Sequence, residues 1–355
     1  MFERILHISI YQRGLVLMAV LMMAIIGVYS YQKLPIDAVP DITNVQVQIN
    51  TNAPGYSPVE AEQRITFPIE TIMAGLPHLD YTRSISRYGL SQVTVIFKDG
   101  TDVYFARQQV SQRIQEAKGR LPVGIEPMMG PISTGLGEIF MWTVDAKPGA
   151  KKLDGSEYTT TDLREIQDWV IRPQLRMVKG VTEINTLGGF VKQFHVVPYP
   201  DKMISFGLSS MDLVTALERN NLNVGAGYIE RSGEQYLVRI PGQIANLNEI
   251  GNIILGSRQG TPIRVKDVAD ILIGKELRTG AATQNGKEVV LGTVHMLIGE
   301  NSRLVAQAAA KKLEEINRNL PEGIVTTPVY DRTTLVDKTI HTVAKNLLEG
   351  AALVI

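Results

Sequence analysis

The stretch SQVTVIFKDGTDVYFARQQVSQRIQEAKGRLPVGI at residues 91–125 is matched in pattern by VLGTVHMLIGENSRLVAQAAAKKLEEINRNLPEGI at residues 290–324. The two stretches align at one constant offset without a gap. Both contain a Thr-Val pair, a glycine ahead of a helix-capping residue (Asp102 or Asn301), and a Leu-Pro-x-Gly-Ile ending. Each copy reads as a strand, a turn, a capped helix, a proline stop and a further strand. The chain therefore contains a duplicated α+β unit.

The first copy extends back to residue 45, where apolar and polar side chains alternate as in a half-buried strand. A helix opening at Ser57-Pro58 and two strands around Gly89 come next. The predicted buried positions of the two helices are Val59, Ile65, Ile69, Ile72, Val103, Ala106, Val110, Ile114 and Ala117. The order β-α-β-β-α-β is that of a ferredoxin-like sandwich, which we assign to residues 34–133 as a subdomain N1.

The second copy begins with a strand from Ile139, followed by a helix capped by Thr161 and a strand over 181–187. About ninety residues then intervene before the pattern resumes at Val289, and an interruption of that length indicates an inserted subdomain. We therefore assign residues 134–188 and 278–331 to a second ferredoxin-like subdomain, N2, and residues 189–277 to the insert. Within the insert, residues 223–238 are expected to form a projecting hairpin that turns at Ser232-Gly233.

Both ends of the chain are apolar. Residues 14–31 contain no charged side chain, which is enough for a membrane helix over 14–33 behind a cytoplasmic N-terminus at 1–13. The alternative is a cleaved signal peptide, although no small-residue cleavage site follows the apolar run. Residues 332–355 run into a second apolar stretch that stops at Ile355. They are interpreted as the truncated start of a second membrane helix.

Composition excludes several classes of protein. The chain has 36 basic and 36 acidic side chains and no cysteine, so it shows no preference for nucleic acid and has no disulfide or thiolate metal site. The glycine-rich stretch 130–137 lacks the Gly-Lys-Ser/Thr ending of a phosphate-binding loop. No Ser/His/Asp or Cys/His arrangement is evident either. We therefore expect no hydrolytic enzyme and no bound cofactor.

Several local motifs together resemble the heavy-metal branch of the resistance–nodulation–division (RND) superfamily of efflux pumps, of the cobalt–zinc–cadmium type. They are LPIDAVPD at 34–41, APGYSP at 53–58, GPISTGLGEIF at 130–140, REIQDW at 164–169, GAGYIER at 225–231 and YDRTTLVD at 330–337. The resemblance covers the whole chain and implies proton-driven export of divalent cations such as zinc, cobalt or cadmium. In that family the two ferredoxin-like units are porter subdomains and the insert is a docking subdomain.

The resemblance also implies an assembly. It predicts an inner-membrane homotrimer with a large periplasmic region, working with a periplasmic adaptor (membrane fusion) protein and an outer-membrane channel. The acids that relay protons are expected beyond residue 355. Two other hypotheses stay open: an RND exporter of another substrate class, and a membrane-anchored periplasmic binding or adaptor module.

Glu138 is the candidate metal ligand. It stands at the start of a strand, directly after the glycines Gly135 and Gly137, which allow close approach, and a carboxylate suits divalent zinc, cobalt and cadmium. In the related copper and silver pumps, as the resemblance implies, an aromatic residue stands here. The alternative is a solvated glutamate at a strand edge, and one carboxylate does not make a site.

Other possible ligands have simpler interpretations. The five histidines His7, His78, His195, His295 and His341 contain no pair at metal-ligand spacing, and His295 is interpreted as an ordinary strand residue. Met128, Met129 and Met141 flank Glu138, but methionine fills cores so readily that packing is the preferred interpretation. The acids Asp37, Asp41, Glu60 and Glu62 are interpreted as solvated surface that could also attract cations.

Overall fold

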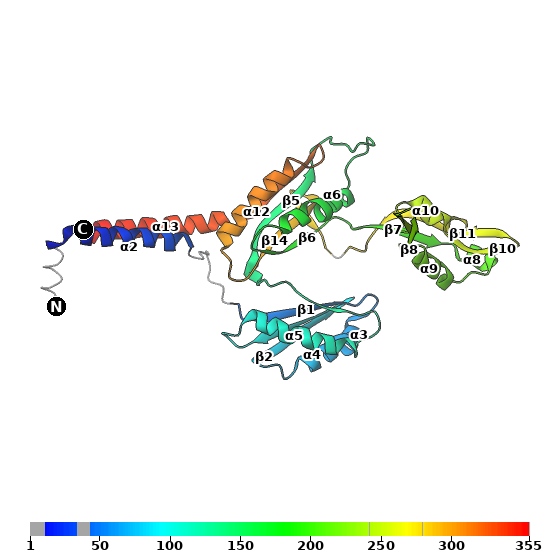
Figure 1. Cartoon of the computed structure of the whole chain (residues 1–355), viewed down its shortest axis with the longest axis horizontal. Helices are drawn as coiled ribbons and strands as arrows, with labels where there is room; N and C mark the ends of the chain where they lie inside the picture. Colours follow the sequence, from blue (N-terminus) through cyan, green and yellow to red (C-terminus); the bar gives the residue numbers. More distant parts are fainter. Residues whose placement is uncertain (1–10, 34–42, 241, 279, 355) are drawn as a thin grey trace. The chain divides into compact units, whose positions relative to one another are not determined.

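The computed structural model describes residues 11–33, 43–240, 242–278 and 280–354 (Figure 1). The predicted motif at 34–41 and most of the predicted cytoplasmic segment at 1–13 lie outside the described residues. The chain divides into two compact units. The first comprises Met1–Gly155, Ile166–Leu187 and Val290–Ile355, and the second comprises Ser156–Glu165 and Gly188–Val289.

The first repeat is a four-stranded antiparallel sheet with helices packed against it. Its elements are β1 (Gln46–Asn52), α3 (Pro58–Ala61), η1 (Glu62–Thr66), α4 (Phe67–Met73), β2 (Leu79–Arg87), β3 (Leu90–Phe97), α5 (Val103–Lys118) and β4 (Pro127–Met129). The strand order in the sheet is β2-β3-β1-β4. Alternate residues of β1 and β3 join one face of the helices in a single core that includes Val47, Ile69 and Val110.

Side-chain caps begin the helices of this repeat. Ser57 forms a capping box with Glu60, and the Asp102 carboxylate accepts from the Phe105 amide. Four of the five predicted core positions of α5 are buried, whereas Val103 in its first turn is only half-buried. The prediction for Val59 is wrong, because this side chain is 60% exposed. It lies two residues from the buried Ala61, which is roughly 200° around a helix and so on the opposite face.

The second repeat has the same order. Its elements are η2 (Gly135–Gly137), β5 (Glu138–Ala146), α6 (Thr160–Ile166), η3 (Gln167–Ile171), α7 (Arg172–Arg176), β6 (Val181–Leu187), β14 (Lys287–Met296), α12 (Ser302–Asn317) and β15 (Ile324–Asp331). Its strands lie in the order β6-β14-β5-β15, which reproduces β2-β3-β1-β4 of the first repeat. Thr159 caps α6 by exchanging hydrogen bonds with Asp162, so the predicted cap at Thr161 is wrong by two residues.

A buried tryptophan fastens this second sheet to its helices. Trp142 of β5 is fully buried, and its Nε1 donates to Gln167 Oε1 of η3 at 3.0 Å. The indole lies against the backbone of Gly292 on the neighbouring strand β14, where any Cβ would come within 2.2 Å of Trp142 Cζ2. The packing of β5 therefore depends on a glycine that is adjacent across the sheet and distant in the sequence.

The second unit has a small core of its own. Its elements are β7 (Lys192–Pro198), α8 (Pro200–Phe206), α9 (Ser210–Arg219), β8 (Val224–Arg231), β9 (Glu234–Ile240), α10 (Leu247–Asn252), β10 (Ile254–Arg258), β11 (Thr261–Arg264), α11 (Val265–Val268), β12 (Ala269–Lys275) and β13 (Ala282–Gln284). Strand β7 pairs with β12, and Met203, Leu213, Ile250 and Val265 are among the buried residues beside them. This unit extends past the predicted insert at 189–277, so the subdomain boundaries stay predictions.

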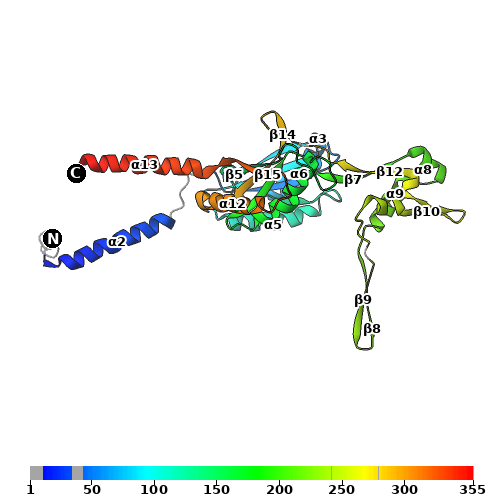
Figure 2. The ribbon, with the colours of Figure 1, turned by 90° about the horizontal axis from the view of Figure 1, so that it is seen from above.

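The predicted hairpin is confirmed. Strands β8 and β9 are antiparallel and turn at Ser232 and Gly233, which have φ of 56° and 80°. Two successive positive φ values are typical of a type I′ turn, whose twist matches that of the strands. Figure 2 shows the pair as a long arm reaching away from the helices of its own unit.

Two long helices complete the chain, α2 (Arg13–Lys33) and α13 (Arg332–Val354). Among the residues that the structure describes, no helix combines the length and apolar character that a membrane crossing requires. The predicted membrane helices at 14–33 and from 332 are therefore not confirmed and stay predictions.

Candidate metal site

Glu138 opens strand β5 directly after the turn η2, and this turn is held from two sides. A Cβ on Gly137 would lie 2.2 Å from Ser133 Oγ and 3.3 Å from the Met296 carbonyl oxygen. The guanidinium of the buried Arg332 donates to the Leu136 carbonyl. Glu138 therefore starts from a backbone that is fixed both by close packing and by a charge-assisted hydrogen bond.

The sheet brings His295 beside Glu138. His295 of β14 is the cross-strand partner of Glu138, and its Nε2 lies 3.8 Å from Glu138 Oε1. The His295 side chain is 12% exposed and that of Glu138 is 46% exposed. Asn185 of β6 completes the group, with its amide Nδ2 donating to His295 Nε2 at 2.9 Å. One carboxylate, one imidazole and one amide thus meet at the end of three neighbouring strands.

The electrostatics of this group favour a neutral imidazole. Burial lowers the pKa of His295, while the carboxylates of Glu138 and Glu183 act in the opposite direction and do not cancel the effect. Glu183 is itself compensated, because Arg172 lies 3.0 Å and Arg176 3.8 Å from its oxygens. The carboxylate of Glu138 therefore faces an uncharged imidazole on the neighbouring strand.

The other predicted residues do not join this group. His78 packs edge-on against Phe105, and His195 pairs with Gln193 in the second unit. Met129 packs against the first core as predicted, whereas Met128 is 68% exposed because it lies on the opposite side of the short strand β4. Over the described ranges, no three His, Cys, Asp or Glu side chains gather in a way that could hold a metal ion.

The acids at the start of the first repeat have a structural role where they are described. Glu60 accepts from the Ser57 amide at 3.0 Å and from the Ser57 hydroxyl at 2.8 Å, and these two hydrogen bonds lower its pKa. Glu62 is exposed in the next turn. Asp37 and Asp41 lie outside the described residues. Glu60 therefore serves as a helix cap, and its role as a cation attractor stays a prediction.

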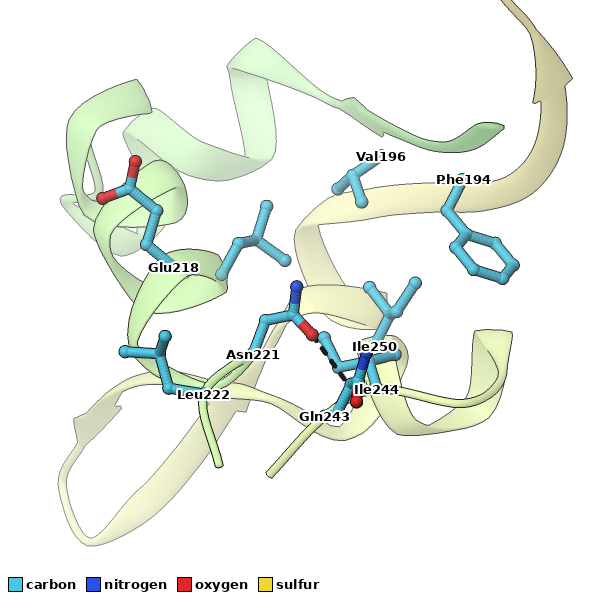
Figure 3. Close-up of a pocket in the computed structure, with 9 residues that line it drawn as sticks. Phe194, Val196, Glu218, Asn221, Leu222, Gln243, Ile244 and Ile250 are labelled. Carbon is cyan, nitrogen blue, oxygen red and sulfur yellow. Dashed lines mark hydrogen bonds between the residues drawn. The ribbon is translucent and has the colours of Figure 1, made fainter. Parts of the chain in front are cut away.

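The second unit contains a groove of a different character. It has a volume of about 650 Å³ and is lined by Phe194, Val196, Leu217, Glu218, Asn221, Leu222, Gln243, Ile244 and Ile250 (Figure 3). Asn221 Oδ1 accepts from the Ile244 amide at 3.2 Å, which joins two of its walls. With one carboxylate among mainly apolar side chains, the groove is poorly suited to a bare divalent cation.

The sequence singles out Glu138 as a candidate ligand but gives little signal for its neighbours in the structure. No second histidine stands at a ligand spacing, so the sequence predicts an ordinary strand residue at His295, and Asn185 carries no local signal. The duplication held a partial clue, because it pairs the strand from Ile139 with the strand that contains His295. The register that brings the two residues face to face depends on a bulge between Val294 and His295, which no local pattern indicates.

Comparison with known proteins places these features in context. The sequence model of the AcrB/AcrD/AcrF family matches residues 5–355. The cobalt-zinc-cadmium resistance protein CzcA of Cupriavidus metallidurans is 69% identical over 355 residues, covering 100% of this chain and 33% of the relative. The cation efflux system protein CzcA of an Alcaligenes strain gives the same identity and coverage.

A solved structure shows a similar arrangement. The crystal structure of a heavy metal efflux pump superposes with a TM-score of 0.87 at 33% identity, covering 96% of this chain and 34% of that one. The chain thus spans about a third of the length of the curated relatives that it matches.

Proposed function

The chain belongs to the AcrB/AcrD/AcrF family of efflux transporters, and from that premise we propose that it is the N-terminal part of a pump that exports divalent heavy-metal cations. The observation that carries this proposal is the 69% identity, along the entire chain, to a protein named for cobalt, zinc and cadmium resistance. Zinc, cobalt and cadmium are therefore the proposed cargo, and proton influx the proposed driving force.

The fine architecture belongs to the same proposal. We assign the two repeats as ferredoxin-like porter subdomains, N1 and N2, and the insert as a docking subdomain. Helix α2 has an apolar surface, with Leu17, Met18 and Leu21 more than 60% exposed, so a lipid bilayer is the surrounding that would satisfy it. We place the protein in the bacterial inner membrane, with the two repeats and the insert on the periplasmic side.

The projecting hairpin supports the proposed homotrimer. Its exposed side chains include Tyr228, Ile229 and Tyr236, and an arm that leaves such residues outside its own core gains stability by packing on a neighbour. A periplasmic adaptor protein and an outer-membrane channel are the further proposed partners, because a periplasmic exporter needs a route across the outer membrane.

Glu138 is the proposed metal ligand within this chain. Its carboxylate is accessible and fixed in backbone position by the Gly137 turn and Arg332. A hard or borderline oxygen ligand of this kind suits Zn²⁺, Co²⁺ and Cd²⁺, and a single exposed carboxylate holds a cation loosely enough for release. No hydrolytic step is needed for such a role.

A hybrid pump tests the proposal. Residues 1–355 of this chain would replace the aligned segment of Cupriavidus metallidurans CzcA in a metal-sensitive host that carries that system's partner proteins. We expect growth on zinc, cobalt and cadmium close to that of the native pump, and lower resistance with Glu138→Gln. Glu322→Gln, at an exposed glutamate of the second repeat, is the matched control and should behave as the unmodified hybrid. A hybrid that is made and inserted at normal levels but gives no resistance would overturn the proposal.

A further inference from the structure

Strand β14 is irregular at one residue, His295. On the β5 side the register skips between Val294, which faces Phe140, and His295, which faces Glu138. On the β6 side it skips again between His295, which faces Glu183, and Met296, which faces Val181. Bulges re-aim a side chain and are frequent beside functional sites. Two ladders are thus interrupted on either side of the same histidine.

The equivalent place in the first repeat shares only one of these two irregularities. Ile96 faces Tyr81 of β2 and Phe97 faces Leu79, so the β2 ladder skips a residue just as the β6 ladder does. The ladder on the β1 side is regular. There Ile96 of β3 pairs with Gln46 of β1 in an unbroken register along the whole of β1. Ile96 is buried, and both its partner and the following pair Val47 and Val95 are uncharged. The bulge on the β5 side, and the Glu138–His295 pair that it creates, are therefore additions of the second repeat, whereas the bulge on the β6 side belongs to the shared fold.

The distance between His295 and Glu138 fits two ligands of one metal ion better than a direct hydrogen bond. At 3.8 Å, His295 Nε2 and Glu138 Oε1 are too far apart for a hydrogen bond. A tetrahedral zinc, with bonds of about 2.0–2.2 Å, separates a nitrogen and an oxygen ligand by about 3.4 Å. Closing the difference requires a movement of about 0.4 Å, which a half-exposed glutamate side chain makes by small torsions.

The third group is positioned to adapt. Asn185 Nδ2 lies 2.9 Å from His295 Nε2, and because an amide nitrogen can only donate, the Nε2 lone pair is directed at Asn185 and becomes available to a cation when the amide turns. Turning the amide by half a rotation would present Asn185 Oδ1 at the same place, and an amide oxygen is a ligand for hard and borderline cations. Glu183 is not needed for this group, because Arg172 holds its carboxylate.

We propose that His295 and Asn185 join Glu138 in an open binding site for a single divalent cation of the zinc and cobalt class. This inference rests on the proposed function and extends it by naming the nitrogen ligand and the adaptable third group. The remaining coordination positions of the cation lie on the exposed side of Glu138, where water or another ligand can bind. Such an incomplete site binds weakly and releases readily, as export requires.

Binding of Co²⁺ alone to the tag-free 355-residue chain in detergent tests the proposal, because cobalt reports its ligands through its visible absorption. We expect His295→Gln to weaken Co²⁺ binding at least 10-fold and to remove the band of the nitrogen-ligated ion. Glu138→Gln should weaken binding to a similar extent, and Asn185→Ala to a smaller one. His195→Gln is the matched control, since this histidine lies in the other unit with its own partner Gln193, and it should leave binding unchanged.

The outcomes separate this inference from the proposed function. If Glu138→Gln weakens binding and His295→Gln does not, the shared site is wrong while Glu138 keeps its proposed role. If neither substitution changes Co²⁺ binding, both the shared site and the role of Glu138 as a ligand are wrong. If only His295→Gln weakens binding, Glu138 is not a ligand and the shared site is wrong. Should His295→Gln misfold, nitrogen NMR of the unaltered chain replaces it. A Zn²⁺-induced shift at His295 Nε2 supports the site, and an unmoved signal at saturating Zn²⁺ overturns it.

Discussion

Gly292→Ala should destabilise the second repeat, because the added methyl group has no space. An ideal Cβ at this position lies 2.2 Å from Trp142 Cζ2, 2.4 Å from Cε2 and 2.9 Å from Gln167 Nε2. Ordinary contact begins near 3.4 Å, so the indole would have to move by about 1 Å within a fully buried site. That movement breaks the 3.0 Å hydrogen bond between Trp142 and Gln167.

The expected magnitude follows from these contacts. Overpacking of a core costs about 1–3 kcal/mol, and leaving buried polar groups unpaired adds about 1–2 kcal/mol. Replacing glycine by alanine offsets about 0.5–1 kcal/mol of this cost, because it reduces the conformational entropy of the unfolded chain. The free energy of unfolding should therefore fall by about 1–4.5 kcal/mol.

Tryptophan fluorescence during urea unfolding measures this change. The chain has 2 tryptophans. Trp142 is buried, Trp169 is 78% exposed, and both lie in the first unit. Gly135→Ala is the control, because a Cβ there meets nothing within 4 Å. In a double-mutant cycle Trp142→Phe, which removes the clashing ring atoms, should lessen the cost of Gly292→Ala. A Gly292→Ala protein as stable as the Gly135→Ala protein would refute the reasoning.

Three further results are expected. The Ser209 hydroxyl and amide donate to Asp212 and lower its pKa. The stabilisation of α9 by these hydrogen bonds is therefore complete above the ordinary pKa of 3.8 and is lost as the pH falls through the lowered pKa. Ser209→Ala should lower the thermal midpoint, measured by circular dichroism, at pH 7, and the difference from the unaltered protein should shrink toward about pH 3. Arg332→Met removes the donor to the Leu136 carbonyl and should speed hydrogen exchange at residues 135–138, with no change at β1 as the control. Gly233→Val places a branched side chain at φ 80° and should lower the trimer yield of the hybrid pump in native mass spectrometry, whereas Gln235→Val on the neighbouring strand should not.

Local periodicity predicted much of the fold. The α5 core positions Ala106, Val110, Ile114 and Ala117 are buried at the helical spacing read from the sequence. The turn at Ser232 and Gly233 is where its dipeptide indicates. The mixed α/β class of the duplicated unit follows from the matched stretches at 91–125 and 290–324. These features depend on neighbours in sequence, whose geometry the local pattern largely determines.

The site was harder to predict, because it depends on register between distant strands. The sequence predicts Glu138 as a candidate ligand from its position after two glycines, but its separation of 3.8 Å from His295 results from a bulge in β14. A one-residue shift in register turns a side chain to the other face of a sheet. Alternation along β14 alone therefore could not decide whether His295 faces Glu138 or the core. Asn185 depends on the same register through β6.

The duplication offers the strongest argument that this cluster is more than a consequence of the fold. The two repeats share strand order, so each position in one has a structural counterpart in the other. Glu138 and His295 correspond to Gln46 and Ile96, which form a neutral pair in regular register. The first repeat thus shows that the sheet folds without a carboxylate–imidazole pair or a bulge between these two strands, although it shares the bulge on the β2 side of Ile96. The interrupted pairing on the β5 side and the facing carboxylate and imidazole, present in one copy only, are the features that the proposed cation site would use.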